Sequence, residues 1–176
     1  MTRKVTVSRA GAQGMLSLRS RRFEHSLKDD MARVIMVDFP QPLQIAQGSD
    51  VALSWMAPDE LLLLCPDHRT DQMRAALGEL AGGTDVLITD VSDMRVRFSL
   101  SGQPLREVLA RLTPADVSSE ALPIGMFRRS RIGQVAAAFW LSADDQADVL
   151  CFRSVADYVE DVLTSAAAYA EPLGLY

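Results

Sequence analysis

The sequence is poor in the side chains that most often carry out catalysis or bind metals. Its 176 residues include 2 histidines and 2 cysteines. His25 and His68 lie among charged or loop-forming residues, whereas Cys65 and Cys151 lie in apolar runs. None of the four has the spacing of a metal-ligand motif. The cysteines are more typical of free thiols buried in a reducing compartment, which predicts a cytoplasmic protein.

Other classes of protein are disfavoured by further absences. No apolar run reaches the length of about 18 residues that a membrane-spanning helix needs. The net charge of −5 argues against nucleic acid, which usually requires a basic face. Gly11 and Gly14 do not complete a dinucleotide-binding glycine motif. The adjacent acids Asp144 and Asp145 are typical of a solvated turn rather than a catalytic pair. We therefore predict no catalytic, cofactor-binding or metal-binding residues in this chain.

Apolar residues, by contrast, are abundant: they form 48% of the chain, enough to bury a core in one domain or two small ones. Residues 1–30 have weak periodicity and an arginine cluster at Arg19, Arg21 and Arg22, which favours a flexible or partner-bound arm. Residues 31–93 are predicted to form a small α+β domain and residues 94–176 a second one. The boundary is expected near residues 90–94, although both halves could share one sheet.

Periodicity indicates the elements of the first domain. Residues 34–39 are apolar and stop at Pro40, which suggests an edge strand. Alternation over residues 51–55, a turn at residues 57–59 and the apolar run 60–65 predict a hairpin. A helix is expected from about Thr70, with an apolar stripe through Met73 and Leu77, and Gly82-Gly83 should end it. Residues 86–91 should form the next strand.

The second domain repeats this order of strands and helices. Strands are expected over residues 96–101, 131–141 (one long strand or a bent pair) and 148–153, and a helix over residues 104–112. Ser154 and Asp157 have the spacing of a helix-capping box. The buried face of the last helix is predicted to consist of Val155, Tyr158, Val159, Val162, Leu163 and Ala166. The predicted fold class is two-layer α+β, with mainly antiparallel sheets and helices on one face. Trp140 should lie in the core, whereas Trp55 fits the core or an interface equally well.

Three segments, taken in order, carry a resemblance to a known family. Residues 55–64 join a tryptophan–proline–aspartate–glutamate turn to a leucine-rich strand. Residues 90–111 join a Val-Ser-Asp strand to a helix entered through Ser101 and Gly102, and residues 153–163 begin a helix with Arg-Ser-x-Ala-Asp-Tyr. Together they resemble the gamma subunits of heterotetrameric sarcosine oxidase, in the folate-binding aminomethyltransferase-like superfamily. Residues 113–117 and the tryptophan-poor last helix depart from the family pattern, which leaves room for a divergent paralogue or another amine substrate.

The resemblance implies a fold like that of the aminomethyltransferase and TrmE folate-binding domains. It also implies a non-catalytic gamma subunit that works with alpha, beta and delta subunits. Such a complex would oxidatively demethylate sarcosine, transfer the one-carbon unit to tetrahydrofolate and form hydrogen peroxide. FAD, FMN, NAD and tetrahydrofolate would be held by the other subunits. A stand-alone module with the folate-binding fold is the alternative, and an ordinary α+β domain is a third interpretation. The isolated chain could also form a homo-oligomer.

The residue types around position 128 suggest where a partner subunit would bind. Methionine, aromatic and arginine residues are enriched at protein interfaces. We therefore predict a partner-binding surface formed by Met126, Phe127, Arg128, Arg129 and Arg131. Arginine clusters also bind carboxylates, but a charged strand face explains these residues without a small-molecule site.

Overall fold

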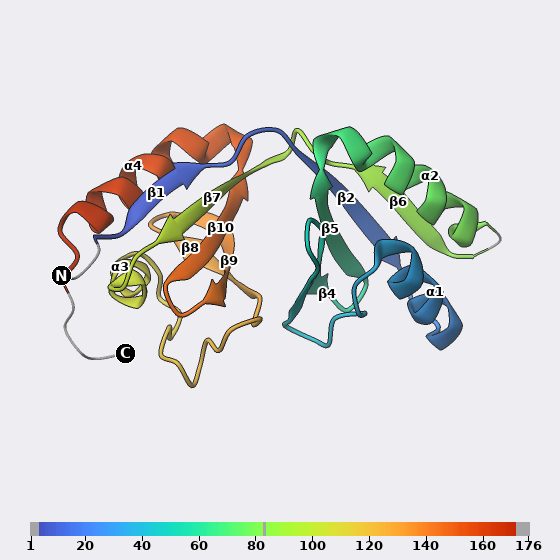
Figure 1. The fold of residues 1–176 in the computed structure, drawn as a ribbon, viewed down its shortest axis with the longest axis horizontal. Coiled ribbons are helices and arrows are strands. Elements are labelled where there is room, and N and C mark those ends of the chain that lie inside the picture. Colours follow the sequence, from blue (N-terminus) through green and yellow to red (C-terminus); the bar gives the residue numbers. More distant parts are fainter. Residues whose placement is uncertain (1–3, 83, 172–176) are drawn as a thin grey trace. The chain divides into compact units, whose positions relative to one another are not determined.

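In the computed structural model, the chain divides into two compact units. The structure describes residues 4–82 and 84–171 (Figure 1). The first unit combines the N-terminal residues 1–10 with residues 94–176, and the second comprises residues 11–93. Gly83, which was expected to help end a helix, lies outside the described residues, as do the extreme ends of the predicted arm and of the C-terminal domain.

The first unit is built on a five-stranded antiparallel sheet. In spatial order its strands are β1 (Thr6–Arg9), β7 (Arg95–Ser101), β10 (Gln146–Phe152), β9 (Val135–Ala143) and β8 (Arg128–Ile132). The predicted stretch 131–141 is therefore a bent pair, because the chain turns at Gly133, whose φ of 56° is in the left-handed region that favours glycine.

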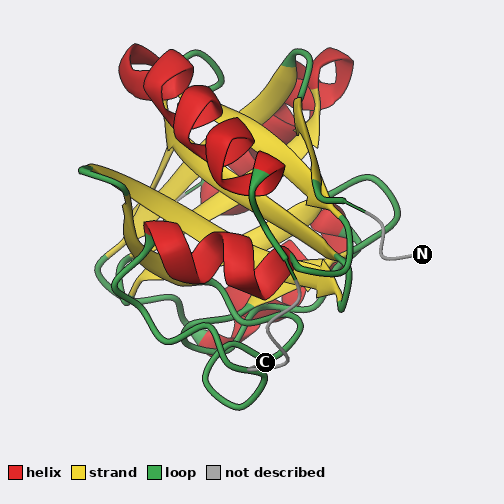
Figure 2. Ribbon diagram, turned by 90° about the vertical axis from the view of Figure 1, so that its left-hand side faces the viewer, coloured by secondary structure: helices red, strands yellow, loops and turns green. Residues whose placement is uncertain are grey.

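Two helices, α3 (Leu105–Leu112) and α4 (Ala156–Ala168), cover one face of this sheet. Their apolar residues pack with Phe98, Phe139 and Val149 of the strands in one core. Leu109 and Leu163 are fully buried there. A short 3-10 turn, η2 (Arg153–Val155), leads into α4. The layering of helices on strands is visible in Figure 2.

The second unit has the same construction with a different strand order. Its sheet consists of β3 (Ile45–Gln47), β4 (Ala52–Ala57), β5 (Glu60–Pro66), β2 (Gln13–Ser20) and β6 (Val86–Asp90), all antiparallel. The helices are α1 (His25–Ile35) and α2 (Thr70–Ala81), which follows the short turn η1 (Asp67–Arg69). Both helices pack on one face of the sheet. The predicted two-layer α+β fold class is thus confirmed, as are the hairpin β4–β5 and the helix from Thr70.

The predicted flexible arm is wrong. Residues 1–30 contain β1, the interior strand β2 and the first half of α1. Five consecutive residues of β2, from Gly14 to Leu18, are buried, so the strand lacks the alternation of apolar and polar residues that would have revealed it. The N-terminal strand β1 pairs with β7 of the first unit, with Thr6 opposite Ser101.

The predicted edge strand over residues 34–39 is also wrong. Helix α1 continues to Ile35, and Met36 ends it in the left-handed conformation, with φ of 63°. The Met36 amide donates to the Ala32 carbonyl, as a helix C-cap does. The apolar run therefore comprises the last turn of a helix and the loop that follows, rather than a strand.

The last helix differs in two details from its prediction. It begins at Ala156, and neither Ser154 nor Asp157 forms a side-chain cap; instead the Asp157 carboxylate lies 2.9 Å from an Arg9 guanidinium nitrogen. Its buried residues are Ala156, Val159, Leu163 and Ala167, whereas Val155, Val162 and Ala166 are partly buried and Tyr158 is 40% exposed. Trp140 is buried as predicted, and Trp55 packs, partly exposed, against the core of the second unit.

Candidate functional site

The predicted partner-binding residues lie on and just before β8, an edge strand of the first unit's sheet. Residues 128, 130 and 132 of β8 face the same side, because a strand alternates its side chains between the two faces. Ile132 on that side belongs to the core, whereas Arg129 and Arg131 project from the opposite face and are exposed. The sequence therefore brings only part of the predicted cluster to the surface.

Phe127 does not contribute to that surface. Its side chain is 1% exposed and packs on Trp140, with the ring centroids 5.5 Å apart and the ring planes tilted by 32°. An aromatic pair of this kind stabilises the unit through buried apolar area and ring contact. Including Phe127 in an exposed docking surface is therefore wrong, and its replacement would test folding rather than binding.

Arg128 and Met126 also have structural contacts. A guanidinium nitrogen of Arg128 donates to the Ala121 carbonyl oxygen at 2.7 Å and lies 3.2 Å from the Met126 sulfur. Met126, partly buried, packs against the core. These contacts connect β8 to the loop that precedes it. The same loop presents Ile124, which is 53% exposed, to solvent.

The exposed remainder of the predicted surface therefore consists of Arg129 and Arg131, with Ile124 in the preceding loop. We call these three residues the β8 patch. Two guanidinium groups on one face of a strand suit an acidic protein surface, since arginine forms planar, charge-assisted hydrogen bonds to carboxylates. The arrangement supplies no nucleophile or general base.

The side chains that could act as acids, bases or nucleophiles are dispersed. His25 begins α1 and His68 lies in η1, and both are exposed. Burial raises the pKa of the Cys151 thiol to about 11, and burial also raises the pKa of the Cys65 thiol. Both thiols are thus protonated near neutral pH and are poor nucleophiles. Within residues 4–82 and 84–171, no group of three or more histidine, cysteine or acidic side chains could hold a metal ion.

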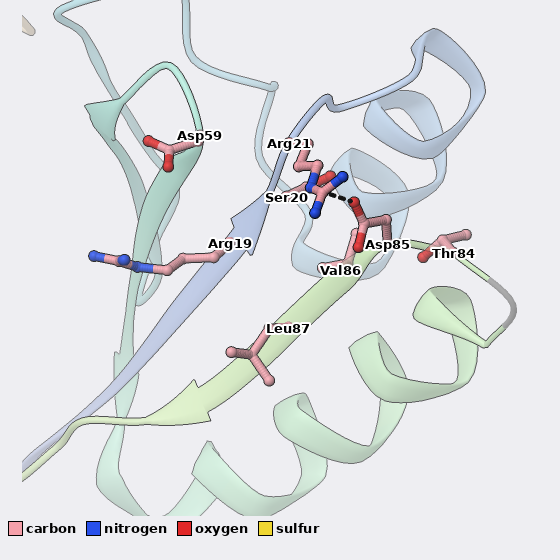
Figure 3. Close-up of a pocket in the computed structure, with 8 residues that line it drawn as sticks. All are labelled: Arg19, Ser20, Arg21, Asp59, Thr84, Asp85, Val86 and Leu87. Atoms are coloured by element: carbon pink, nitrogen blue, oxygen red, sulfur yellow. Dashed lines mark ion pairs between the residues drawn. The ribbon is translucent and has the colours of Figure 1, made fainter.

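The second unit has an open surface depression of about 350 Å³ between β2 and β6 (Figure 3). Arg21 and Asp85 form an exposed ion pair there at 3.7 Å. Arg19 lies nearby but pairs with Glu60 at 2.9 Å. Because its charged groups neutralise one another and are exposed to solvent, this depression lacks the properties of a catalytic pocket. No sequence pattern predicts this depression, because it depends on which strands are neighbours in the sheet.

Comparisons with known structures define the fold. The chain superposes on glycine cleavage system aminomethyltransferase T from Bartonella henselae with a TM-score of 0.67 and 14% identity, covering 91% of this chain and 45% of that one. It superposes on a chain of the heterotetrameric sarcosine oxidase from Corynebacterium sp. U-96, in complex with pyrrole 2-carboxylate, with a TM-score of 0.84 and 20% identity. That match covers 93% of this chain and 84% of the other. The class is therefore an α+β protein with the aminomethyltransferase-like fold.

Sequence comparison then identifies the family. The sarcosine oxidase subunit gamma of Corynebacterium sp. (strain P-1) is 24% identical over 140 residues, which are 77% of this chain and 67% of that protein. The model of the sarcosine oxidase, gamma subunit family matches residues 24–169. The chain belongs to this family, as the three sequence motifs predicted. No helix in the described part of the chain is long and apolar enough to cross a membrane.

Proposed function

We propose that the chain is the non-catalytic gamma subunit of a sarcosine oxidase complex and packs on the aminomethyltransferase-like part of the large subunit. The complex would oxidatively demethylate sarcosine, pass the one-carbon unit to tetrahydrofolate and form hydrogen peroxide. The family match over residues 24–169 carries this proposal. The dispersed histidines and protonated thiols support a structural rather than a catalytic role.

The other subunits would supply the chemistry. In this proposal the alpha, beta and delta subunits are the partners, and FAD, FMN, NAD and tetrahydrofolate bind to those subunits. The two free, buried cysteines fit a protein of the reducing cytoplasm. The gamma subunit would act by covering part of the large subunit and fixing its geometry.

The β8 patch is our proposed docking surface for the large subunit. Arg129 and Arg131 project from an edge strand whose inner side is anchored in the core by Ile132. A rigid strand presents its guanidinium groups with little loss of conformational freedom on binding. The large subunit should therefore offer carboxylates to this strand.

Co-expression with the other three subunits tests the proposal. We expect this chain to co-purify with a yellow, flavin-containing complex that forms peroxide from sarcosine, whereas the chain alone should carry no flavin and form no peroxide. If the chain binds no oxidase subunit, or if the isolated chain binds tetrahydrofolate tightly, the accessory-subunit function is wrong and the stand-alone folate-binding module is favoured.

A charge-reversal pair tests the docking surface itself. The Arg129→Glu, Arg131→Glu double variant should weaken assembly by at least about tenfold, because it places carboxylates opposite carboxylates. The matched control is Arg22→Glu, Arg33→Glu, which makes the same charge change at two exposed positions of the second unit. Equal affinities for the two double variants would show that the β8 patch is not the docking surface.

A further inference from the structure

The edge strand β6 differs from the other sheet edges among the described residues. Edge strands expose unpaired backbone groups, and proteins usually protect them with charge, shortness or a covering element. β8 carries three arginines, and β3 has three residues. β1 is four residues long and is tied to α4, because Arg9 pairs with Asp157 at 2.9 Å and Glu160 at 3.4 Å.

β6 is less protected, because its one charged residue, Asp90, lies at its end. Its five residues, Val-Leu-Ile-Thr-Asp, contain no lysine, arginine or proline, and pair in regular register with β2 on one side. Leu87, at its centre, is 63% exposed. A regularly paired edge with an exposed apolar side chain at its centre is a template for pairing with another strand.

The direction of the β6 backbone groups follows from one hydrogen bond. The Val91 amide donates to the Met15 carbonyl of β2 at 2.8 Å. Because backbone groups in an antiparallel strand alternate in direction, Thr89 and Leu87 also point toward β2. The amides and carbonyls of Val86, Ile88 and Asp90 therefore point away from the sheet, toward its open edge.

Depressions flank this edge on both faces of the sheet. On the face of α2, an open groove of about 530 Å³ is lined by small residues of the helix, among them Ala75 and Gly78, and by Val86 and Ile88 of β6. The ion pair of Asp71 and Arg74 also lines it. On the other face lies the depression of about 350 Å³, where Leu87 and its cross-strand partner Arg19 project from neighbouring strands (Figure 3). An added strand would thus direct alternate side chains into two recesses.

We propose that β6 binds an extended segment of another subunit of the complex, which adds to the sheet as a sixth strand. Main-chain hydrogen bonds to Val86, Ile88 and Asp90 would provide the pairing, as in other cases of β-strand addition. The segment would place alternate side chains in the groove beside α2, where alanine, valine and isoleucine suit aliphatic groups and the Asp71 and Arg74 side chains suit polar ones. This inference rests on the proposed function, which supplies the partner.

Hydrogen exchange of the assembled complex gives the direct test. In the isolated chain, the amides of Val86, Ile88 and Asp90 should exchange quickly, whereas those of Leu87 and Thr89 should be protected by β2. In the assembled complex all five should exchange slowly. Fast exchange of the three outward amides in an intact complex would overturn the strand addition while leaving the proposed function standing.

Two substitutions block the edge, and each has a matched control. Gly78→Leu fills the groove, where a Cβ at position 78 meets nothing within 4 Å, and Gly78→Ala makes a similar helix change but leaves most of the groove open. Leu87→Lys adds a charge to the β6 edge, and Gln72→Lys adds the same charge away from that edge, on α2. We expect Gly78→Leu and Leu87→Lys to weaken assembly by about tenfold or more and the controls by less than about threefold.

Three outcomes contradict the inference. Unchanged assembly of both blocking variants would mean that the edge is not used, even if the complex forms. Protection of the outward amides in the isolated chain, rising with its concentration, would assign the edge to a second copy of this chain. Failure of the unmodified chain to assemble with any oxidase subunit would overturn the proposed function and this inference with it.

Discussion

Replacing Met36 with glycine should stabilise the chain, although it removes a large apolar side chain. Met36 ends α1 with φ of 63° and ψ of 32°, and its side chain is 79% exposed. An L-residue pays roughly 1–2 kcal/mol in the left-handed region. Glycine avoids that cost but loses about 0.5–1 kcal/mol more conformational entropy on folding. Because the exposed side chain contributes little packing, the net gain should be about 0.5–1 kcal/mol.

Denaturant unfolding measured side by side for three proteins tests this reasoning. Met36→Gly should raise the free energy of unfolding, whereas Met36→Ala should change it by less than about 0.5 kcal/mol, since alanine keeps the Cβ that makes the conformation costly. If alanine stabilises as much as glycine, removal of the side chain is responsible and the conformational argument is wrong. If glycine destabilises the chain, Met36 makes contacts that outweigh its backbone strain.

Three further predictions concern the first unit. Leu109→Ala and Leu163→Ala should each lower the free energy of unfolding by about 2–5 kcal/mol, as for other buried leucines, and a loss below about 1 kcal/mol would mean that the helix faces are misassigned. Gly133→Ala should also lower the free energy of unfolding, because the new Cβ would lie 2.4 Å from the Tyr158 hydroxyl and the backbone φ at position 133 is positive. In a double-mutant cycle, adding Tyr158→Phe should recover part of this lost stability. Burial raises the pKa of the Cys151 thiol to about 11 from an ordinary 9.0, so the unfolded chain loses this proton at a lower pH than the folded chain. The free energy of unfolding should therefore fall between about pH 9 and 11. The Cys151→Ala variant should lack this part of the decrease when unfolding is measured across the pH range.

The elements that could be predicted from the sequence are those with a strong local pattern. The hairpin β4–β5 has alternation and a turn, and α2 has an apolar stripe with Gly82 at its end. β2 was missed because its consecutive buried residues show neither the two-residue period of a half-buried strand nor the 3.6-residue period of a helix. The run after Val34 was misassigned because a helix end followed by a packed loop is as apolar as a strand.

The candidate surfaces show the same division between local and global information. Arginines at positions 129 and 131 could be recognised as surface residues by type, but the burial of Phe127 depends on Trp140, which lies 13 residues further along the chain. The open edge of β6 could not be predicted at all, because strand order is a property of the whole sheet. The sequence shows which residue types suit an interface, but only the fold determines whether those residues are exposed.

The pairing of β1 with β7 has a consequence for synthesis on the ribosome. Residues 11–93 form a continuous unit, so this unit can fold while the nascent chain is still growing. Strand β1 is made before residues 11–93 and must wait without its neighbour until Ser101, 95 residues after Thr6, has emerged. The unit that contains β1 is therefore completed after the other one, and until then β1 is an unpaired strand open to non-native pairing.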